Sequence, residues 1–308
     1  RIWNAATLDQ LSITLRGHKD ALNAVAFSPS GGEILTSSDD KTTKVWNTRD
    51  GQLITELKGL SNLKPSFREK TLGEVNSAIF SPNGRFVVTS SSDRKVIVGD
   101  GQRSSHGKQL TYTPARIWDW KSGKMVQSFK GFKTGVAFSI YSADGNRLLT
   151  ASDGRAKDGF LNAFGQMPNA SSGPTQDSTN AKIWNVKTGA LMSILEGHTG
   201  ALVGAAFSHD GGRVVTSDVY AVRVWNAHNG RLISTLDSDA ARTPFVAFSP
   251  DDRYVLARRG GAQIELWDPD TGAALHRLQQ RQSFLLAYYG PQGKEIISIG
   301  HNGAFRKT

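Results

Sequence analysis

Three side chains near the start of the chain have the types that a hydrolytic triad needs. His18, Thr36 and Asp40 supply an imidazole, a hydroxyl and a carboxylate, the set that activates a hydroxyl nucleophile when the three lie in hydrogen-bond contact. The same types return further along the chain, around His198, in a similar sequence context. A catalytic triad is needed once, whereas a structural contact recurs with every repeat. We therefore favour a structural role for these residues.

The rest of the sequence offers few other groups for chemistry. The chain of 308 residues contains no cysteine, which excludes disulfides, thiolate metal sites and cysteine nucleophiles. Its seven histidines are scattered, and phosphate-loop, zinc-protease and serine-hydrolase motifs are absent. Residues 268–272 resemble the opening of a calcium loop without its later ligands, so they predict a hairpin turn. We expect no catalytic residue, no metal and no cofactor.

A short signature returns six times along the chain. An aromatic residue is followed by serine or its equivalent and by a turn rich in Pro, Asp, Asn and Gly, beginning at Phe27, Phe80, Tyr141, Phe207, Phe248 and Tyr289. A second signature, an aliphatic residue and tryptophan followed by Asp or Asn, alternates with the first at Trp3, Trp46, Trp118, Trp184, Trp225 and Trp267. A period of about 40 residues indicates a repeat architecture.

The first complete repeat predicts four short antiparallel strands. Apolar or alternating runs at 22–27, 33–37, 43–46 and 53–57 are separated by turns that contain Gly, Asp and Asn, which reverse the chain at little conformational cost. Successive four-stranded sheets bury their faces against one another in a β-propeller. The sequence therefore predicts an all-β fold, a β-propeller of four-stranded antiparallel blades forming a single domain over 1–308.

The repeats resemble the WD repeats (WD40) of β-propeller proteins. The best matches are residues 15–47 and 195–226, and the resemblance covers essentially the whole chain. In that family a His, a Ser or Thr, an Asp and a Trp form a buried hydrogen-bonded tetrad that holds a blade together. The resemblance implies such a tetrad here, made of His18, Thr36, Asp40 and Trp46.

Other repeats depart from the pattern of the family. Gly59-Leu60 and Gly131-Phe132 stand where Gly-His is expected, and residues 257–260 lack the expected Thr and Asp. The spacing around Asp218 also differs from the spacing around Asp40, which leaves the tetrad of that repeat open.

The number of predicted strands indicates how many blades the chain fills. Two strands at the start, within 1–4 and 11–15, precede five complete blades, and three strands follow, the last around 304–308. This count fits seven blade positions with one incomplete. Six blades are the alternative, in which 1–4 and 304–307 would compete for one place. The abrupt ends suggest a chain that is part of a longer protein.

Three insertions interrupt the repeats. Successive intervals between the signature tryptophans are 43, 72, 66, 41 and 42 residues, which places the extra residues near 61–74, 95–114 and 155–180. Residues 96–100 themselves resemble a degraded strand of the blade, so the boundary of the second insertion is open. In WD propellers these connections emerge on one face, and the resemblance implies that the insertions rise together.

The insertions combine cations with aromatic side chains, a composition that suits a protein interface. We expect the partner site to consist of Lys64, Phe67, Arg68, Arg94, Arg103, His106, Lys108, Tyr112, Phe160 and Phe164. The alternative is that these aromatic residues pack back on their own propeller and brace it.

The sequence favours a non-catalytic scaffold or sensor module of a larger signalling or regulatory protein. The even repeats resemble the bacterial branch of the WD family, whose repeats often serve this role beside other domains. A net charge of +10 makes an acidic partner a candidate. Two alternatives remain: a nucleic-acid-associated module with a basic face, and a propeller enzyme with a site at the central axis. With no membrane-length apolar run and no cysteine, we expect a cytoplasmic protein that binds another protein or a fused domain.

Overall fold

The computed structural model describes residues 2–3, 10–11, 13–58, 74–92, 96–98, 108–110, 114–132, 135–152, 180–236, 245–259, 263–279, 284–290, 293, 295–300 and 305–307. These residues form strands and turns and contain no helix. The all-β class predicted from the sequence is confirmed.

Most of the described strands assemble into four-stranded antiparallel sheets, each a blade built from consecutive repeat strands. The strands of the first sheet are β3 (Leu22–Phe27), β4 (Glu33–Ser38), β5 (Thr42–Asn47) and β6 (Leu53–Lys58). The second has β7 (Val75–Phe80), β8 (Phe86–Ser91), β11 (Ala115–Asp119) and β12 (Lys124–Phe129). The third has β13 (Val136–Tyr141), β14 (Arg147–Ser152), β15 (Ala181–Asn185) and β16 (Leu191–Leu195).

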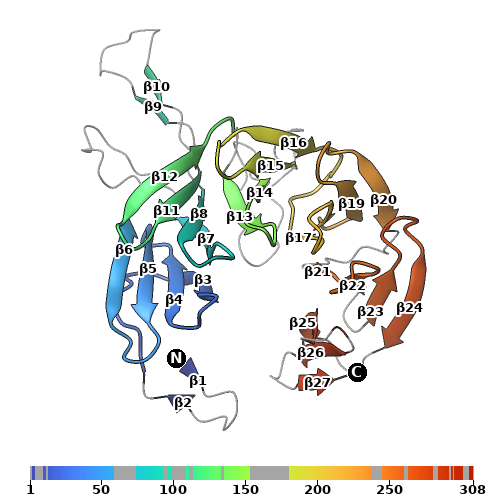
Figure 1. Ribbon diagram of the computed structural model, residues 1–308, viewed down its shortest axis with the longest axis horizontal. Helices are drawn as coiled ribbons and strands as arrows, with labels where there is room; N and C mark the ends of the chain where they lie inside the picture. The colour runs from blue at the N-terminus through green and yellow to red at the C-terminus, as the bar shows by residue number, and fades with distance from the viewer. Residues whose placement is uncertain are drawn as a thin grey trace, which may run out of the picture. The chain divides into compact units, whose positions relative to one another are not determined.

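Two further sheets repeat this order (Figure 1). The fourth has β17 (Gly204–Phe207), β18 (Arg213–Ser217), β19 (Val222–Asn226) and β20 (Leu232–Leu236). The fifth has β21 (Val246–Phe248), β22 (Val255–Arg259), β23 (Gln263–Trp267) and β24 (Ala274–Gln279). In all five sheets, the strand that carries the signature tryptophan pairs with the last, outer strand of the repeat.

The two ends of the chain contribute shorter sheets. A two-stranded sheet contains β1 (Ile2–Trp3) and β2 (Gln10–Leu11), and a three-stranded sheet contains β25 (Phe284–Tyr289), β26 (Ile296–Gly300) and β27 (Phe305–Lys307). Two strands at the start and three at the end were predicted from the sequence, and the described strands match these numbers. The second strand was predicted at 11–15, whereas in the described residues it pairs at Gln10 and Leu11.

In four of the six signatures, the serine stabilises the turn between the first two strands of the blade in the same way. In the second sheet, the backbone N–H of Phe86 donates to Oγ of Ser81 at 2.9 Å, and that hydroxyl donates to Oδ1 of Asn83 at 2.7 Å. Ser142, Ser208 and Ser249 make the same pair of contacts with an aspartate in place of the asparagine. The recurring Ser-x-Asp/Asn pattern is therefore a turn motif, in which a short side chain replaces backbone partners.

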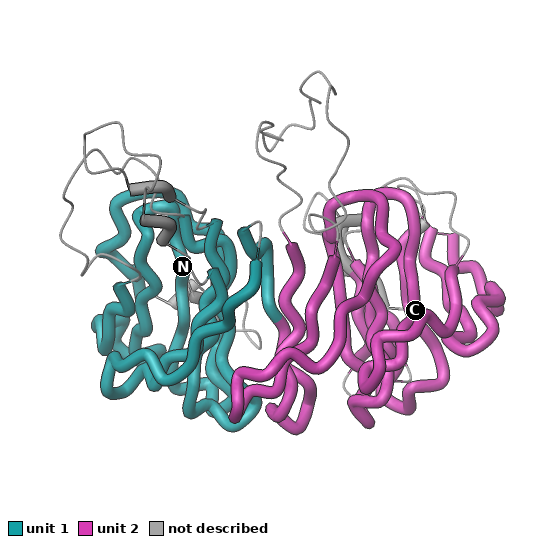
Figure 2. Tube along the Cα trace, turned by 90° about the horizontal axis from the view of Figure 1, so that it is seen from above, with its two compact units in different colours: residues 1–139 teal, residues 140–308 magenta. Residues whose placement is uncertain are grey.

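The chain divides into two compact units, residues 1–139 and 140–308, with the boundary inside β13 (Figure 2). In unit 1 the first two sheets share a core of Leu35, Val45, Leu57, Ala78, Phe80, Val87, Trp118 and Trp120. In unit 2 the fourth and fifth sheets share a core of Val215, Val222, Val224, Leu236, Val246, Phe248, Val255, Ala257 and Trp267. Each core joins one face of a blade to the facing side of the next.

The second blade takes its third strand from beyond the insertion. Residues 96–100 resembled a degraded strand of this blade, but β8 pairs instead with β11. Val96–Val98 forms β9 and pairs with β10 (Lys108–Leu110) in a separate two-stranded sheet. Ala115–Asp119 takes the third position of the blade because it brings Trp118 into the core and because its first four residues are buried.

Candidate functional site

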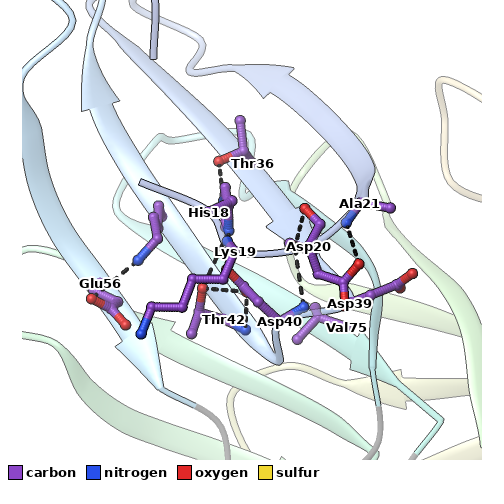
Figure 3. Close-up of polar contacts among 12 residues, drawn as sticks. His18, Lys19, Asp20, Ala21, Thr36, Asp39, Asp40, Thr42, Glu56 and Val75 are labelled. Atoms are coloured by element: carbon purple, nitrogen blue, oxygen red, sulfur yellow. Dashed lines mark hydrogen bonds and ion pairs between the residues drawn. The ribbon is translucent and has the colours of Figure 1, made fainter. Parts of the chain in front are cut away.

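The four residues implied by the family resemblance lie in one hydrogen-bonded chain. Figure 3 shows three of them, Thr36, His18 and Asp40. Nε1 of Trp46 donates to Oγ1 of Thr36 at 2.8 Å, and the same oxygen lies 2.8 Å from Nε2 of His18. Nδ1 of His18 lies 2.8 Å from Oδ2 of Asp40. The indole can only donate and the carboxylate accepts, so the threonine hydroxyl donates to Nε2 and the imidazole carries its proton on Nδ1.

The hydrogen bonds from Thr36 to His18 and from His18 to Asp40 are those of a catalytic triad. Burial and the indole distinguish this site from one. Thr36 and Trp46 are buried, the hydroxyl of Thr36 also accepts from Trp46, and the ring of His18 contacts Trp46 edge-on. The geometry therefore fits a structural clip.

The carboxylate of Asp40 also organises the loop around it. Oδ2 accepts from the backbone N–H of Lys19 at 2.9 Å, and Oδ1 accepts from the N–H and the hydroxyl of Thr42 at 2.9 and 2.6 Å. Burial acts to raise the pKa of Asp40, but the hydrogen bonds from Thr42, Lys19 and His18 outweigh it and hold the pKa well below the usual value. Asp40 stays ionised and ties the segment before β3 to the turn between β4 and β5.

A second complete tetrad lies in the fourth sheet, where the sequence left the question open. Nε1 of Trp225 donates to Oγ1 of Thr216 at 2.7 Å, which lies 2.6 Å from Nε2 of His198, and Nδ1 of His198 lies 2.8 Å from Oδ2 of Asp218. Asp218 directly follows β18, and its carboxylate accepts from the N–H groups of Tyr220 and Ala221. The turn after Asp218 therefore accommodates the different spacing between the aspartate and the tryptophan of this repeat.

The second tetrad carries a cation that the first lacks. Nη1 of Arg223 lies 2.9 Å from Nδ1 of His198 and 3.7 Å from Oδ2 of Asp218. At the matching position of the first sheet, the ammonium of Lys44 lies 3.1 Å from Oε2 of Glu56 instead. Burial disfavours the charged imidazole and lowers the pKa of His198. The carboxylate of Asp218 acts to raise this pKa, and the positive charge of Arg223 lowers it further.

Other blades keep only part of the contact. Trp118 donates to Thr89 and Trp184 donates to Thr150, each at 2.9 Å. In the fifth sheet the threonine position holds Ala257, and the buried Glu265 pairs with Arg277 at 2.8 Å. The tryptophan–threonine bond is thus the most persistent element of the motif in the described sheets.

One turn contains a contact that the sequence reasoning missed. Asp252 has a φ of 59°, in the left-handed region, where the other signatures have glycine at 31, 84, 145, 211 and 293. Its carboxylate accepts from the N–H groups of His209 and Asp210 at 2.8 and 3.0 Å and so links two neighbouring blades. The sequence did contain a signal for this contact, because Asp252 stands where the other signatures have glycine.

The residues predicted to form the partner site fall outside the described part of the structure. The structure does not describe nine of these ten residues: Lys64, Phe67, Arg68, Arg94, Arg103, His106, Tyr112, Phe160 and Phe164. Lys108 begins β10, but its side chain is not described. The predicted interface therefore stays a prediction. Among the described residues, no group of three His, Asp or Glu could hold a metal ion, and no helix has the length and apolarity to span a bilayer.

Acid is expected to destabilise the fourth sheet in two steps. The pKa of His198 is lowered from 6.5 in the fold, so protons bind the unfolded chain preferentially and stability falls as the pH drops below about 6.5. The pKa of Asp218 is lowered from 3.8, because the bonds from His198 and the turn outweigh burial, so a further loss follows below that pH. Urea midpoints between pH 8 and pH 3 measure both steps. A His276→Gln variant, changed at an exposed histidine, should keep the profile; a flat wild-type profile would contradict the assignment.

Comparison with known proteins supports the repeat architecture. The family model for the WD domain, G-beta repeat, matches residues 9–47 and 62–100. The second match ends at Asp100 and therefore includes β9, whereas the structure completes this blade with β11.

Curated relatives carry the similarity across the chain. Autophagy-related protein 16 of Arabidopsis thaliana is 23% identical over 309 residues, covering 94% of this chain and 56% of that protein. Small ribosomal subunit protein RACK1y of Oryza sativa is 24% identical over 173 residues, 54% of this chain and 42% of that protein. Nuclear distribution protein PAC1 of Komagataella phaffii is 33% identical over 100 residues, 31% of this chain and 18% of that protein.

The chain spans just over half of the first relative's length and less of the others. These relatives are eukaryotic and give no support to the expected bacterial affinity. Together with the four-stranded blades and the two tetrads, the matches identify the repeats. Residues 9–47 and 62–100 are WD40 repeats, and the other four-stranded blades repeat the same strand order.

Proposed function

We propose that this chain is a non-catalytic protein-interaction scaffold or sensor module. The observation that carries the proposal is the closed hydrogen bonding of both tetrads, because the His and Asp side chains best suited to catalysis are committed to holding blades together. The family match to proteins such as autophagy-related protein 16 supports the same class of function. A rigid array of blades is a platform on which connecting loops bind.

The partner site is proposed on the three insertions. They leave the scaffold between β6 and β7, between β8 and β11, and between β14 and β15. Their aromatic residues would supply buried anchors, and their cations would steer a partner that carries negative charge. The chain would act as part of a larger signalling or regulatory protein, since it spans little more than half of the first relative.

Trimming residues 103–112, or replacing Phe67, Phe160 and Phe164 with serine, is expected to abolish partner binding while the melting temperature stays nearly unchanged. Each central aromatic anchor typically contributes about 2 kcal/mol or more. Calorimetric titration of a partner identified by proximity labelling, together with thermal melts, measures both quantities. An Arg49→Ala variant, changed at an exposed turn of the first blade, serves as the control.

The two readings of the insertions differ in which quantity changes. If the loops brace the propeller, the serine variants will melt at a lower temperature and each folded molecule will bind normally. Binding of DNA or RNA with a steep salt dependence would instead favour the basic-face alternative, which the net charge of +10 supports. Catalytic turnover of a substrate that disappears when one carboxylate at the central axis is removed would favour the alternative of a propeller enzyme.

A further inference from the structure

All five four-stranded sheets have the same irregularity in their outer strand. The signature tryptophan pairs with one residue of the outer strand, and the residue just before the tryptophan pairs two places further on, so one outer residue is bulged. In unit 2, Trp184 pairs with Leu191, and Ile183 pairs with Ser193, which leaves Met192 as the extra residue. The bulged residues of the five blades are Ile54, Val126, Met192, Ile233 and Leu275.

The bulged residues are large, apolar and exposed. Their exposed fractions lie between 37% and 50%, and Leu53, Met125, Leu191 and Leu232, which precede four of them, are exposed to a similar extent. Single exposed apolar residues are ordinary on a protein surface. Here, by contrast, an exposed apolar pair, the bulged residue and the residue before it, recurs at the same place in successive blades. A β-bulge also changes the direction in which its side chains point.

Contacts between blades bring these pairs next to one another in unit 2. Gly230, just before Leu232, has a φ of 71°, and a Cβ there would lie 2.7 Å from the carbonyl oxygen of Ile194, two residues after Met192. Gly272 has a φ of 73° and a Cβ there would lie 2.7 Å from the carbonyl oxygen of Thr235, two residues after Ile233. The hydroxyl of Ser234 also donates to the carbonyl of Pro269 at 2.6 Å.

The turns at Gly230 and Gly272 therefore contact the outer strand of the preceding blade. Figure 1 shows β16, β20 and β24 following one another along the outer edge of unit 2. We call the exposed residues Leu191, Met192, Leu232, Ile233 and Leu275 the outer apolar belt. The belt runs from blade to blade across strands, so it offers an elongated apolar strip.

Two of the three turns beside the belt carry exposed cations. The turn before Leu275 differs, because it contains Asp268 and Asp270, and Asp270 pairs with Arg213. Lys187 and Arg231 are exposed at its turns and form no ion pair within the described part of the chain. Arg277, which is 62% exposed, lies two residues beyond Leu275 and pairs with Glu265. A second copy of this chain would bring like charges together, since the net charge is +10. Strand addition is also disfavoured, because a bulge interrupts the outer edge of every blade.

We propose that the outer apolar belt of unit 2 docks a protein segment in which aliphatic side chains stand beside carboxylates, as on an acidic amphipathic helix. The aliphatic residues contact Leu232, Ile233 and their neighbours, and the carboxylates pair with Lys187 and Arg231. This site deepens the proposed scaffold function and uses residues that do not belong to the insertions. A helix laid across the belt would use aliphatic residues spaced three and four apart.

A labelled synthetic peptide of about 18 residues, five helical turns, with leucines on one face and glutamates beside them, is the probe. Fluorescence anisotropy measures its binding to the full chain. We expect Leu232→Ser with Ile233→Ser to weaken binding at least tenfold, an effect of about 1.4 kcal/mol, at an unchanged melting temperature. Lys187→Glu with Arg231→Glu should weaken binding and reduce its salt dependence.

Matched controls separate this site from its alternatives. Leu22→Ser with Val25→Ser removes two exposed apolar residues on the inner strand β3 and should leave binding unchanged. Trimming 103–112 should also leave it unchanged, so this site and the proposed insertion site fail independently. Four outcomes would overturn the proposal. The chain could bind equally well a peptide with every leucine changed to serine, or the Leu232/Ile233 variant could bind the original peptide as well as the wild type does. The chain could also bind no peptide, or bind only phosphatidylserine vesicles.

Discussion

Replacing Asp218 with alanine is expected to lower the free energy of unfolding by about 3–5 kcal/mol, because it removes a fully buried carboxylate from a hydrogen-bond network that also includes the partly exposed Arg223. The Asp218 side chain is inaccessible to solvent, and it accepts bonds from His198, from the N–H groups of Thr199 and Gly200, and from the turn that follows. Alanine leaves all these donors without their acceptor and leaves the Arg223 guanidinium without its nearby carboxylate.

Urea unfolding monitored by tryptophan fluorescence, with hydrogen exchange at Tyr220 and Ala221, measures the effect of Asp218→Ala. Asp40→Ala, in the less enclosed tetrad of the first blade, should cost less, about 1–3 kcal/mol. Asp20→Ala is the control, because the exposed Asp20 caps only the N–H of Ala21. Equal stability of Asp218→Ala and Asp20→Ala would show that the tetrad of the fourth sheet does not hold its blade.

Phe80→Ala is expected to cost about 3–5 kcal/mol, whereas the equivalent Phe27→Ala should cost less than about 1 kcal/mol. Phe80 is 8% exposed in the core shared by the first two blades and contacts Trp120 edge-on. Phe27 occupies the same place in its own signature but is 59% exposed. Removing a ring that water already reaches loses little transfer free energy and creates no cavity.

Thermal and chemical denaturation of the two phenylalanine variants side by side tests this difference. Phe248→Ala, at the matching buried position of the fifth blade, should behave like Phe80→Ala. A large loss of stability in Phe27→Ala would mean that its face is covered in solution. Similar small losses in all three variants would contradict the assignment of the inter-blade cores.

The sequence determined the repeat and almost all that follows locally from it. Period, turn chemistry and the two signatures predicted the strands of the first blade to within one residue at each end. These features are local, because a Ser-x-Asp turn and an alternating run act within a few residues. The tetrad of His18 came from family resemblance, and its atoms then fixed the direction of each hydrogen bond.

The tertiary structure decided what depends on residues far apart in sequence. Residues 96–100 resembled a degraded strand of the second blade, but it is Ala115–Asp119 that pairs with β8 and buries Trp118. The tetrad of His198 depended on a turn of different length, which backbone donors to Asp218 close. The exposure of Phe27 and the outer apolar belt likewise follow from which face meets a neighbouring blade. A single repeat contains no information on that contact, because each blade buries its surface only against another.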